Sequence, residues 1–236
     1  MNSRFWVVVP AAGVGSRMAS RIPKQYLPLA GRTVIEWSLA PFLAEPSVAG
    51  IVVVLGQADT HWPQLAVSRD ARIVLAPGGQ ERMYSVLSGL IRLEDTAESG
   101  DWVLVHDAAR PCLHRTDLER LLASAAPGFA GGLLAAPVVD TLKRADDEGC
   151  VRDTLSRTGI WRAFTPQMFP YAELRDALER AVDEQWTVTD EASAMEQVGG
   201  RPHLVPGRAD NIKITSPADL VMAEAIHRSW AQRGEH

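Results

Sequence analysis

Short apolar runs alternate with amphipathic stretches along most of the chain. Short apolar runs, several of them rich in β-branched residues, predict strands at residues 5–9, 51–55, 72–75, 102–106 and 132–136. Apolar residues at helical spacing predict helices from Thr33 to about Leu43, over Ser85–Leu93, Asp117–Ala125, Tyr171–Asp183 and Glu191–Val198, and after Ser216. The first of these helices should begin with a capping box, Thr33-Val34-Ile35-Glu36. This alternation is typical of the α/β class, a mainly parallel sheet flanked by helices.

The pattern changes between Pro137 and about Phe164. Two β-rich segments, residues 137–143 and 151–155, enclose the polar turn Asp146-Asp147-Glu148-Gly149, which predicts a β-hairpin. Two isolated strands are only marginally stable in water. We therefore expect a protruding β-arm over about residues 138–164 that packs on something outside itself.

A glycine loop directly follows the first predicted strand. It reads Pro10-Ala11-Ala12-Gly13-Val14-Gly15-Ser16-Arg17, and Pro23-Lys24-Gln25 comes soon after it. Glycines at positions 13 and 15 let the backbone approach a ligand and leave N–H groups free to bind oxyanions. Arg17 and Lys24 add positive charge, so the sequence predicts a phosphate-binding loop.

Two common glycine-loop classes do not fit this segment. The dinucleotide fingerprint G-x-G-x-x-G needs a third glycine where Met18 stands, and an acidic residue after the second strand, where Gly56-Gln57 stands. A P-loop needs a Gly-Lys pair, which occurs nowhere in the sequence. The remaining pattern, A-A-G-x-G-x-R-M followed by P-K, resembles the signature of nucleotidyltransferases.

Composition is consistent with one compact enzyme. The chain has 236 residues, 46% hydrophobic and 22% charged, and we expect a single domain over residues 1–236. A net charge of −5 argues against nucleic acid or an anionic membrane surface as a partner. Two cysteines are too few for a disulfide scaffold or a cysteine-rich zinc site. With no signal-peptide pattern and no long apolar span in the sequence, we expect a cytoplasmic location.

Two clusters near strand ends are candidate parts of a site. Gly78-Gly79-Gln80-Glu81-Arg82 with Ser85 is expected to hold a base or ribose, although an ordinary strand-to-helix turn would look the same. His106-Asp107-Ala108-Ala109-Arg110-Pro111 ends the fourth predicted strand, at the edge where open α/β sheets bind ligands. Asp107 and Arg110 are the candidates there, whereas a strand-end histidine such as His106 is more often a hydrogen-bonded structural group.

Two more clusters come from the arm and from the last third of the chain. The first contains Thr141, Arg157 and Thr165, and the second contains Thr189 and Lys213. Lys213 stands between Ile212 and Ile214, so its stem should be partly buried and its ammonium must find an anion. The alternative is a lysine on an edge strand that reaches out to solvent.

Eight motifs in order carry a resemblance over nearly the whole chain: A-A-G-x-G-x-R, P-K-Q-Y, G-G-x-x-R-x-x-S-V, H-D-A-A-R-P, P-x-x-D-T-L-K, W-x-A-x-T-P-Q-x-F, T-D-E-A-S and N-I-K-I-T. Together they resemble the 2-C-methyl-D-erythritol 4-phosphate cytidylyltransferases of the non-mevalonate isoprenoid pathway. The resemblance implies a Rossmann-like nucleotidyltransferase domain with a β-arm that forms a homodimer. It also implies that CTP and methylerythritol phosphate react, with Mg²⁺, to give the CDP-alcohol and pyrophosphate.

Residue roles follow from this chemistry, because transfer between two anions requires cations around the reacting phosphorus. Arg17 and Lys24 are assigned to the transition state. The polyol phosphate should meet Arg157 and Lys213, with Asp107, Arg110, Thr141, Thr165 and Thr189 as further substrate-binding residues. The nucleotide should contact Pro10, Ala11, Ala12, Gly13, Gly15, Gly79, Gln80, Ser85, Asp107 and Ala108.

Mg²⁺ should bind mainly through the CTP phosphates, with few protein ligands; Asp107 and Asp210 are the carboxylates of interest. The arm is expected to carry Thr141 and Arg157 into the site of a second subunit.

Three alternatives remain open. A ribitol 5-phosphate cytidylyltransferase shares most of the motifs. A sugar 1-phosphate nucleotidyltransferase with another base is disfavoured by the arm and the short base loop. A nucleotide-binding regulator without catalysis is disfavoured because Arg17, Lys24, Arg157 and Lys213 are all retained.

Overall fold

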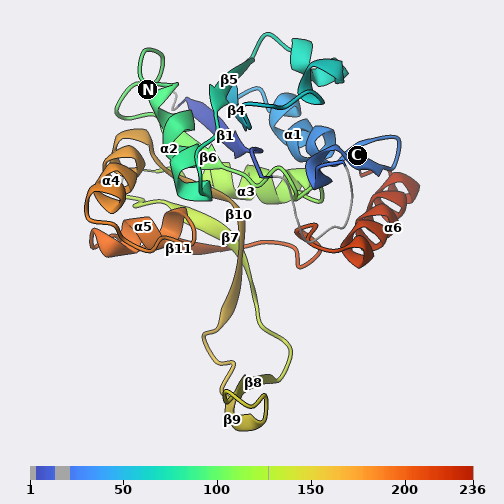
Figure 1. The fold of residues 1–236 in the computed structure, drawn as a ribbon, viewed down its shortest axis with the longest axis vertical. Helices are drawn as coiled ribbons and strands as arrows, with labels where there is room; N and C mark the ends of the chain where they lie inside the picture. Colours follow the sequence, from blue (N-terminus) through green and yellow to red (C-terminus); the bar gives the residue numbers. More distant parts are fainter. Residues whose placement is uncertain (1–3, 14–21, 127, 236) are drawn as a thin grey trace.

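A seven-stranded sheet forms the centre of the molecule (Figure 1). The computed structural model describes residues 4–13, 22–126 and 128–235. The strands of the sheet are β1 (Phe5–Pro10), β4 (Val48–Leu55), β5 (Ile73–Pro77), β6 (Trp102–Val105), β7 (Gly132–Pro137), β10 (Trp161–Pro170) and β11 (His203–Pro206), in the order β11-β7-β10-β6-β1-β4-β5. All neighbours are parallel except β10, which is antiparallel to both β6 and β7. The predicted mainly parallel α/β sheet is therefore confirmed.

All five predicted strands are present in the central sheet, and its other two strands, β10 and β11, were not predicted. The sequence of β10, WRAFTPQMFP, contains two prolines and shows no strict alternation of apolar and polar residues. Its pairing with β7 is irregular between Ala163 and Gln167, around a Thr165–Pro166 peptide bond that is cis. The other strand, β11, has only four residues. Proline and short length both weaken the signals on which strand prediction depends.

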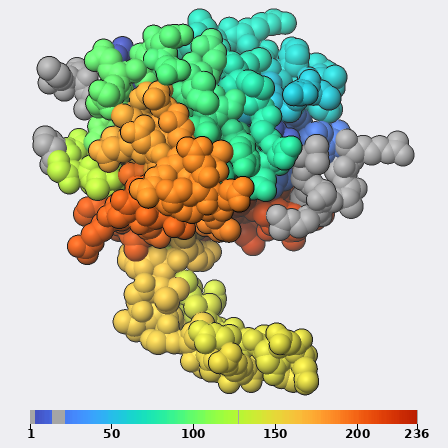
Figure 2. Space-filling view, turned by 60° about the vertical axis from the view of Figure 1, so that its left-hand side comes forward, coloured from blue at the N-terminus to red at the C-terminus, as the bar shows by residue number. Residues whose placement is uncertain are grey.

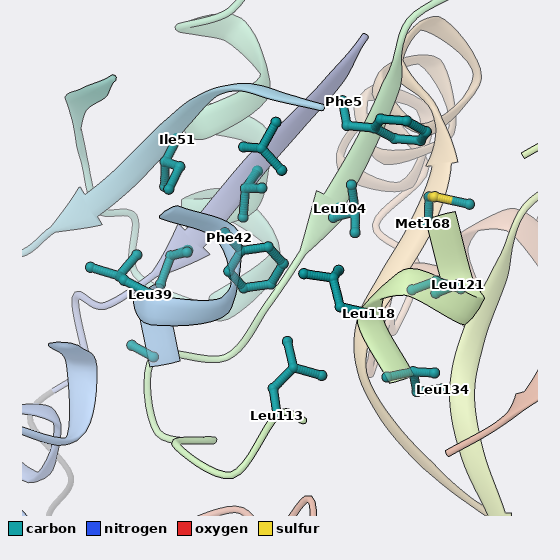
Figure 3. Close-up of a cluster of buried hydrophobic side chains, with 14 of the residues drawn as sticks. Phe5, Leu39, Phe42, Ile51, Leu104, Leu113, Leu118, Leu121, Leu134 and Met168 are labelled. Atoms are coloured by element: carbon teal, nitrogen blue, oxygen red, sulfur yellow. The ribbon is translucent and has the colours of Figure 1, made fainter. Parts of the chain in front are cut away.

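Helices cover both faces of the sheet, since successive strand residues point to opposite sides. Val7 and Val9 pack with Leu39 and Phe42 of α1 (Val34–Ala44) and with α3 (Arg115–Ala123). Figure 3 shows Leu39 and Phe42 in this cluster, together with Leu118 and Leu121 of α3. Val8 packs on the other face, with α2 (Arg82–Ile91), α4 (Tyr171–Asp183) and α5 (Glu191–Gln197). These are five of the six predicted helices, and the capping box at Thr33 is formed.

The remaining elements are short or lie beside the sheet. The final helix, α6 (Pro217–Arg233), packs through Ala223 and Trp230 against Val34 and Ile214. Single turns of 3-10 helix occur at η2 (Lys24–Tyr26), η3 (Trp62–Gln64) and η4 (Ala66–Arg69), and a small ladder joins β2 (Pro28–Leu29) to β3 (Arg32–Thr33). In the described part of the chain, no helix is both long and apolar enough to cross a membrane.

The arm protrudes from the body as a separate hairpin (Figures 1 and 2). Its tip is the antiparallel pair β8 (Leu142–Ala145) and β9 (Val151–Leu155). Because β10 takes up Trp161–Pro170, the part outside the central sheet covers residues 138–160 rather than reaching Phe164, which is buried. Val139 and Val151 on the arm are 72% and 64% exposed. The predicted hairpin is therefore present, and it carries apolar side chains that are largely exposed.

Candidate active site

The larger of two neighbouring cavities lies at the carboxyl ends of β1, β5 and β6. It has a volume of about 240 Å³. In the sheet, β1 lies between β4 and β6. The chain continues from β1 to β4 and β5 on one side and returns to β6 on the other, so the cavity lies where the strand order reverses. Among the expected nucleotide-binding residues, its lining includes Pro10, Ala11, Ala12, Gly13, Gly79, Gln80, Ser85, Asp107 and Ala108. Gly15 and Arg17 lie outside the described residues.

Close backbone approach explains the glycine turn after β5. A Cβ atom on Gly78 would lie 2.2 Å from the Cβ of Ala12, and one on Gly79 would lie 2.4 Å from the Cβ of Tyr84. Ser85 holds the turn, because its hydroxyl accepts from the Gly79 N–H at 3.1 Å and donates to the Glu81 carbonyl at 3.2 Å. The Ser85 hydroxyl therefore shapes this wall of the cavity through the backbone.

The first loop presents its backbone to the same cavity. A Cβ on Gly13 would meet no atom of the described residues within 4 Å, so protein packing does not require glycine there. Gln25 holds the loop from behind by donating to the carbonyls of Ala11 at 2.7 Å and Gly13 at 3.2 Å. Lys24, from η2, also lines the cavity, and its ammonium donates to the Ile214 carbonyl at 3.0 Å.

Asp107 is the centre of a cluster of charges. Its carboxylate lies 2.9 Å from Lys213 Nζ, 3.1 Å from Arg82 Nε and 3.4 Å from Arg110 Nε. Burial alone would raise the pKa of Asp107, but the charges of Arg82, Lys213 and Arg110 together hold that pKa well below its ordinary value. The predicted anion for Lys213 is therefore Asp107 itself.

Arg82 and Glu191 form an ion pair that the sequence did not single out. Arg82 Nη1 and Nη2 lie 2.6 and 3.1 Å from the two Glu191 oxygens, and Glu191 is buried. Burial tends to lower the pKa of Arg82, but Glu191 and Asp107 raise it above its ordinary value. Arg82 stands in the G-G-x-x-R-x-x-S-V motif and Glu191 in the T-D-E-A-S motif, but nothing in the sequence pairs two residues that lie 109 positions apart.

The smaller cavity adjoins the larger one and shares Arg82, Asp107 and Lys213 with it. Its volume is about 140 Å³. Its other lining residues include Arg110, Phe164, Thr165, Gln167, Thr189 and Asp190. Arg110 is fixed by donation from Nη1 to the Asn211 carbonyl at 2.8 Å. The structure thus gathers Asp107, Arg110, Thr165, Thr189 and Lys213, all expected substrate-binding residues, around one cavity.

His106 lies behind this cavity as a buried, hydrogen-bonded side chain, as its position predicted. Its ring nitrogens lie 3.0 Å from Thr165 Oγ1 and 3.1 Å from the Arg110 carbonyl. Burial lowers the pKa of His106 to about 4, so the ring is neutral near pH 7.

Two expected substrate-binding residues lie elsewhere. Thr141 and Arg157 are exposed on the arm and line neither cavity. Arg157 donates to the Val139 carbonyl of the same arm. Asp210, one of the two carboxylates of interest for a metal, pairs with Arg208 at 3.0 Å and also lines neither cavity. Within residues 4–13, 22–126 and 128–235, no three His, Cys, Asp or Glu side chains converge on a metal position.

Comparison with known proteins identifies the family. The family model of 2-C-methyl-D-erythritol 4-phosphate cytidylyltransferase matches residues 5–229. A protein of that name from Ectopseudomonas mendocina (strain ymp) is 54% identical over 234 residues, which are 99% of this chain and 98% of that protein.

Solved structures agree. A crystal structure of 4-diphosphocytidyl-2C-methyl-D-erythritol synthase has a TM-score of 0.83 at 36% identity and covers 96% of this chain and 100% of its own. The Francisella tularensis 2-C-methyl-D-erythritol 4-phosphate cytidylyltransferase has a TM-score of 0.82 at 34% identity, with 95% and 100% covered. The chain therefore belongs to the 2-C-methyl-D-erythritol 4-phosphate cytidylyltransferase family.

Proposed function

We propose that this protein transfers CMP from CTP to 2-C-methyl-D-erythritol 4-phosphate and releases pyrophosphate. Family membership supports this reaction. The observation that carries it in the structure is the pair of adjoining cavities, which share the charge cluster of Arg82, Asp107 and Lys213. One cavity would hold the nucleotide and the other the polyol phosphate, so that the two reacting phosphates meet at the shared wall.

The reaction needs positioning and charge more than it needs a base. A phosphate oxygen of the polyol phosphate attacks the α-phosphorus of CTP, and the bond from that phosphorus to the bridging oxygen of the β-phosphate breaks. The nucleophile is already anionic, so no proton has to be removed. Lys24, at the wall of the larger cavity, and Arg17, in the loop before it, would stabilise the charge that develops on the transferring group.

Cytosine is the base that we propose for the larger cavity. The Gly79–Gln80 turn lies close against the helix that follows it and would form the base-binding part of the cavity. A purine is larger than cytosine, and uracil reverses the donor and acceptor at the 4-position, so a site built around cytosine rejects both.

Mg²⁺ would be bound mainly by the triphosphate. Asp107 lines the larger cavity but already faces three cations, so it fits a metal ion at most as one ligand among phosphate oxygens and waters. When bound, Mg²⁺ would neutralise charge on the triphosphate and on the departing pyrophosphate.

The arm supports a homodimer. Its exposed apolar residues need a cover, and its two strands form a ladder too small to be stable by itself. In a two-fold dimer, exchange of the arms would be reciprocal and would bring Thr141 and Arg157 of each chain to the partner's smaller cavity. Arg157 would then complete a pair of cations, with Lys213, for the dianionic phosphate.

A cytoplasmic location belongs to the same proposal. Cys112 and Cys150 are both free in the structure, which suits a reducing compartment.

A pyrophosphate-release assay tests the proposal. CTP, UTP, ATP and GTP are each combined with methylerythritol 4-phosphate, ribitol 5-phosphate and a hexose 1-phosphate. We expect CTP with methylerythritol 4-phosphate to turn over far faster than any other pair. Faster turnover of ribitol 5-phosphate would assign the alternative acceptor, and equal turnover of CTP and ATP would remove the cytidylyltransferase assignment.

A further inference from the structure

The turn after β6 is held in place by a chain of hydrogen bonds that passes through the buried ring of His106. The Asp107 N–H donates to Thr165 Oγ1 at 3.0 Å. Thr165 Oγ1 lies 3.0 Å from His106 Nδ1, and His106 Nε2 lies 3.1 Å from the Arg110 carbonyl oxygen. The ring is fully buried and packs edge-on against Phe42, with centroids 5.2 Å apart.

The direction of each hydrogen bond in this chain is fixed. A carbonyl oxygen only accepts, so His106 Nε2 must carry the proton that bonds to the Arg110 carbonyl. The ring is fully buried, which favours its neutral form. With Nε2 protonated, Nδ1 has no proton and accepts from the Thr165 hydroxyl. The Thr165 oxygen in turn accepts from the backbone of Asp107.

Thr165 is one of the residues that line the smaller cavity, and its two hydrogen bonds fix the polarity of its hydroxyl. A hydroxyl has one donor proton and two acceptor positions. The proton of Thr165 is used by His106, and one acceptor position is used by the Asp107 N–H. What remains is one acceptor position, which suits a hydroxyl donor on a ligand and does not suit a phosphate oxygen.

We propose that His106 is a positioning residue that holds the Thr165 hydroxyl as an acceptor, so that a hydroxyl group of the polyol binds at Thr165 while its phosphate binds at Lys213. This inference rests on the proposed transfer to a polyol phosphate and assigns a role within it. His106 acts only through Thr165 and through the Arg110 carbonyl; it contacts neither the substrate nor the reacting phosphorus. Nothing in the reaction asks it to change protonation.

The first test reads the tautomer of His106 directly in the wild-type protein. A two-bond ¹H–¹⁵N NMR spectrum distinguishes a protonated from an unprotonated imidazole nitrogen. We expect the Nε2–H tautomer near pH 7. The Nδ1–H tautomer would overturn the proposal, because Thr165 would then accept from His106 and keep its own proton for a phosphate.

The second test reads the polarity of the cavity through substrate analogues. Each hydroxyl of methylerythritol 4-phosphate is replaced in turn by fluorine, which has a similar size but cannot donate a hydrogen bond. For one of these analogues, we expect wild-type kcat/KM to fall about tenfold, the size of one neutral hydrogen bond. In His106→Phe the Thr165 hydroxyl loses its acceptor and can rotate. The ratio of kcat/KM for the natural substrate to kcat/KM for the fluorinated analogue should then shrink to less than about threefold.

A second buried histidine provides the matched control. His227, on α6, also holds a carbonyl of this turn, since its Nε2 lies 3.0 Å from the Pro111 oxygen. His227→Phe should lower turnover of the natural substrate and of the analogue by the same factor, which leaves their ratio at the wild-type value. An equal ratio in His106→Phe and wild type would refute the proposal, as would a ratio that shrinks equally in both variants.

These outcomes separate this inference from the proposed function. If wild-type protein failed to transfer CMP to methylerythritol 4-phosphate at all, the proposed function would be wrong. If wild-type protein transferred CMP while the substitution of His106 changed the kcat/KM ratio of no fluorinated analogue, the proposed reaction would be correct and the proposed role of His106 would be wrong. Should His106→Phe not fold, the tautomer measurement on the wild-type protein still decides.

Discussion

The charge cluster at the sheet edge and the arm carry the same kinds of functional residue in opposite surroundings. Asp107 and its three cationic partners are held by short contacts at the ends of buried strands. Thr141 and Arg157 are exposed on a two-stranded hairpin that projects into solvent (Figure 2). One region is therefore organised before any ligand binds, and the other lines neither cavity among the residues that the structure describes.

The difference between these regions shows which part of the substrate site a single subunit can form without a partner. Ion pairs in a partly buried cluster are screened little by solvent, so they fix the direction of each side chain. An exposed arginine gains little from a nearby charge and keeps most of its conformational freedom. A site for a dianionic phosphate that depends on Arg157 therefore becomes complete only when another surface orders the arm.

The largest effect on stability should come from opening the buried ion pair. Glu191→Ala would leave Arg82 with Asp107 alone, and we expect the free energy of unfolding to fall by about 4 kcal/mol in a guanidinium titration. The exposed arm pair is the control: Arg144 lies 3.6 Å from Asp153, with both side chains substantially exposed. Arg144→Ala should change the free energy of unfolding by less than about 0.5 kcal/mol. Equal losses in the two variants would contradict the contrast between the regions.

The next effect concerns catalysis. Lys24→Ala should lower kcat by about a hundredfold or more, equivalent to a transition-state contact of about 3 kcal/mol, and should weaken CTP binding far less. Single-turnover kinetics together with equilibrium CTP binding separate the two quantities. Lys143→Ala, an exposed arm lysine that donates to Thr154, serves as the matched control and should keep wild-type kcat. Normal kcat with lost CTP affinity in Lys24→Ala would remove the transition-state role.

A smaller, graded effect should appear in acid. Burial lowers the pKa of His106 from 6.5 to about 4. Between these values the unfolded chain binds a proton at His106 that the folded protein does not bind, so stability falls as the pH falls. His106 should contribute a slope of about 1.4 kcal/mol per pH unit in this window and none below about pH 4. Unfolding titrations at several pH values should show this part of the slope missing in His106→Phe; identical slopes in the two proteins would count against a neutral buried ring.

The fold could be predicted where local pattern and tertiary role agree. Buried parallel strands read as continuous apolar runs, mostly rich in β-branched residues, and this pattern identified the five predicted strands, although β7 (GLLAAP) contains no β-branched residue. The exception, β10, runs antiparallel through the middle of the sheet with Pro166 inside it, so neither periodicity nor propensity indicates a strand. Its place between β7 and β6 is decided by long-range pairing, which local sequence does not record.

The site divides in the same way. Asp107, Arg110 and Lys213 were predicted because strand-end position and an apolar setting are visible in the sequence, and the structure brings them together. The partnership of Arg82 with Glu191 was missed because it joins residues 109 positions apart. The prediction that Arg157 acts in a second subunit remains a prediction, because the structure of one subunit shows Arg157 exposed on the arm and contains no second subunit.

Subunit mixing tests most directly whether the arm completes a partner's site. Lys213→Ala and Arg157→Ala homodimers should each be nearly inactive, because every site in them lacks one cation. After subunit exchange, each heterodimer should contain one intact site and one doubly defective site, so an equal mixture should recover about a quarter of wild-type activity. If heterodimers verified by mass spectrometry stay as inactive as the parent proteins, or if the protein is a fully active monomer at assay concentration, donation of Arg157 across the dimer is wrong.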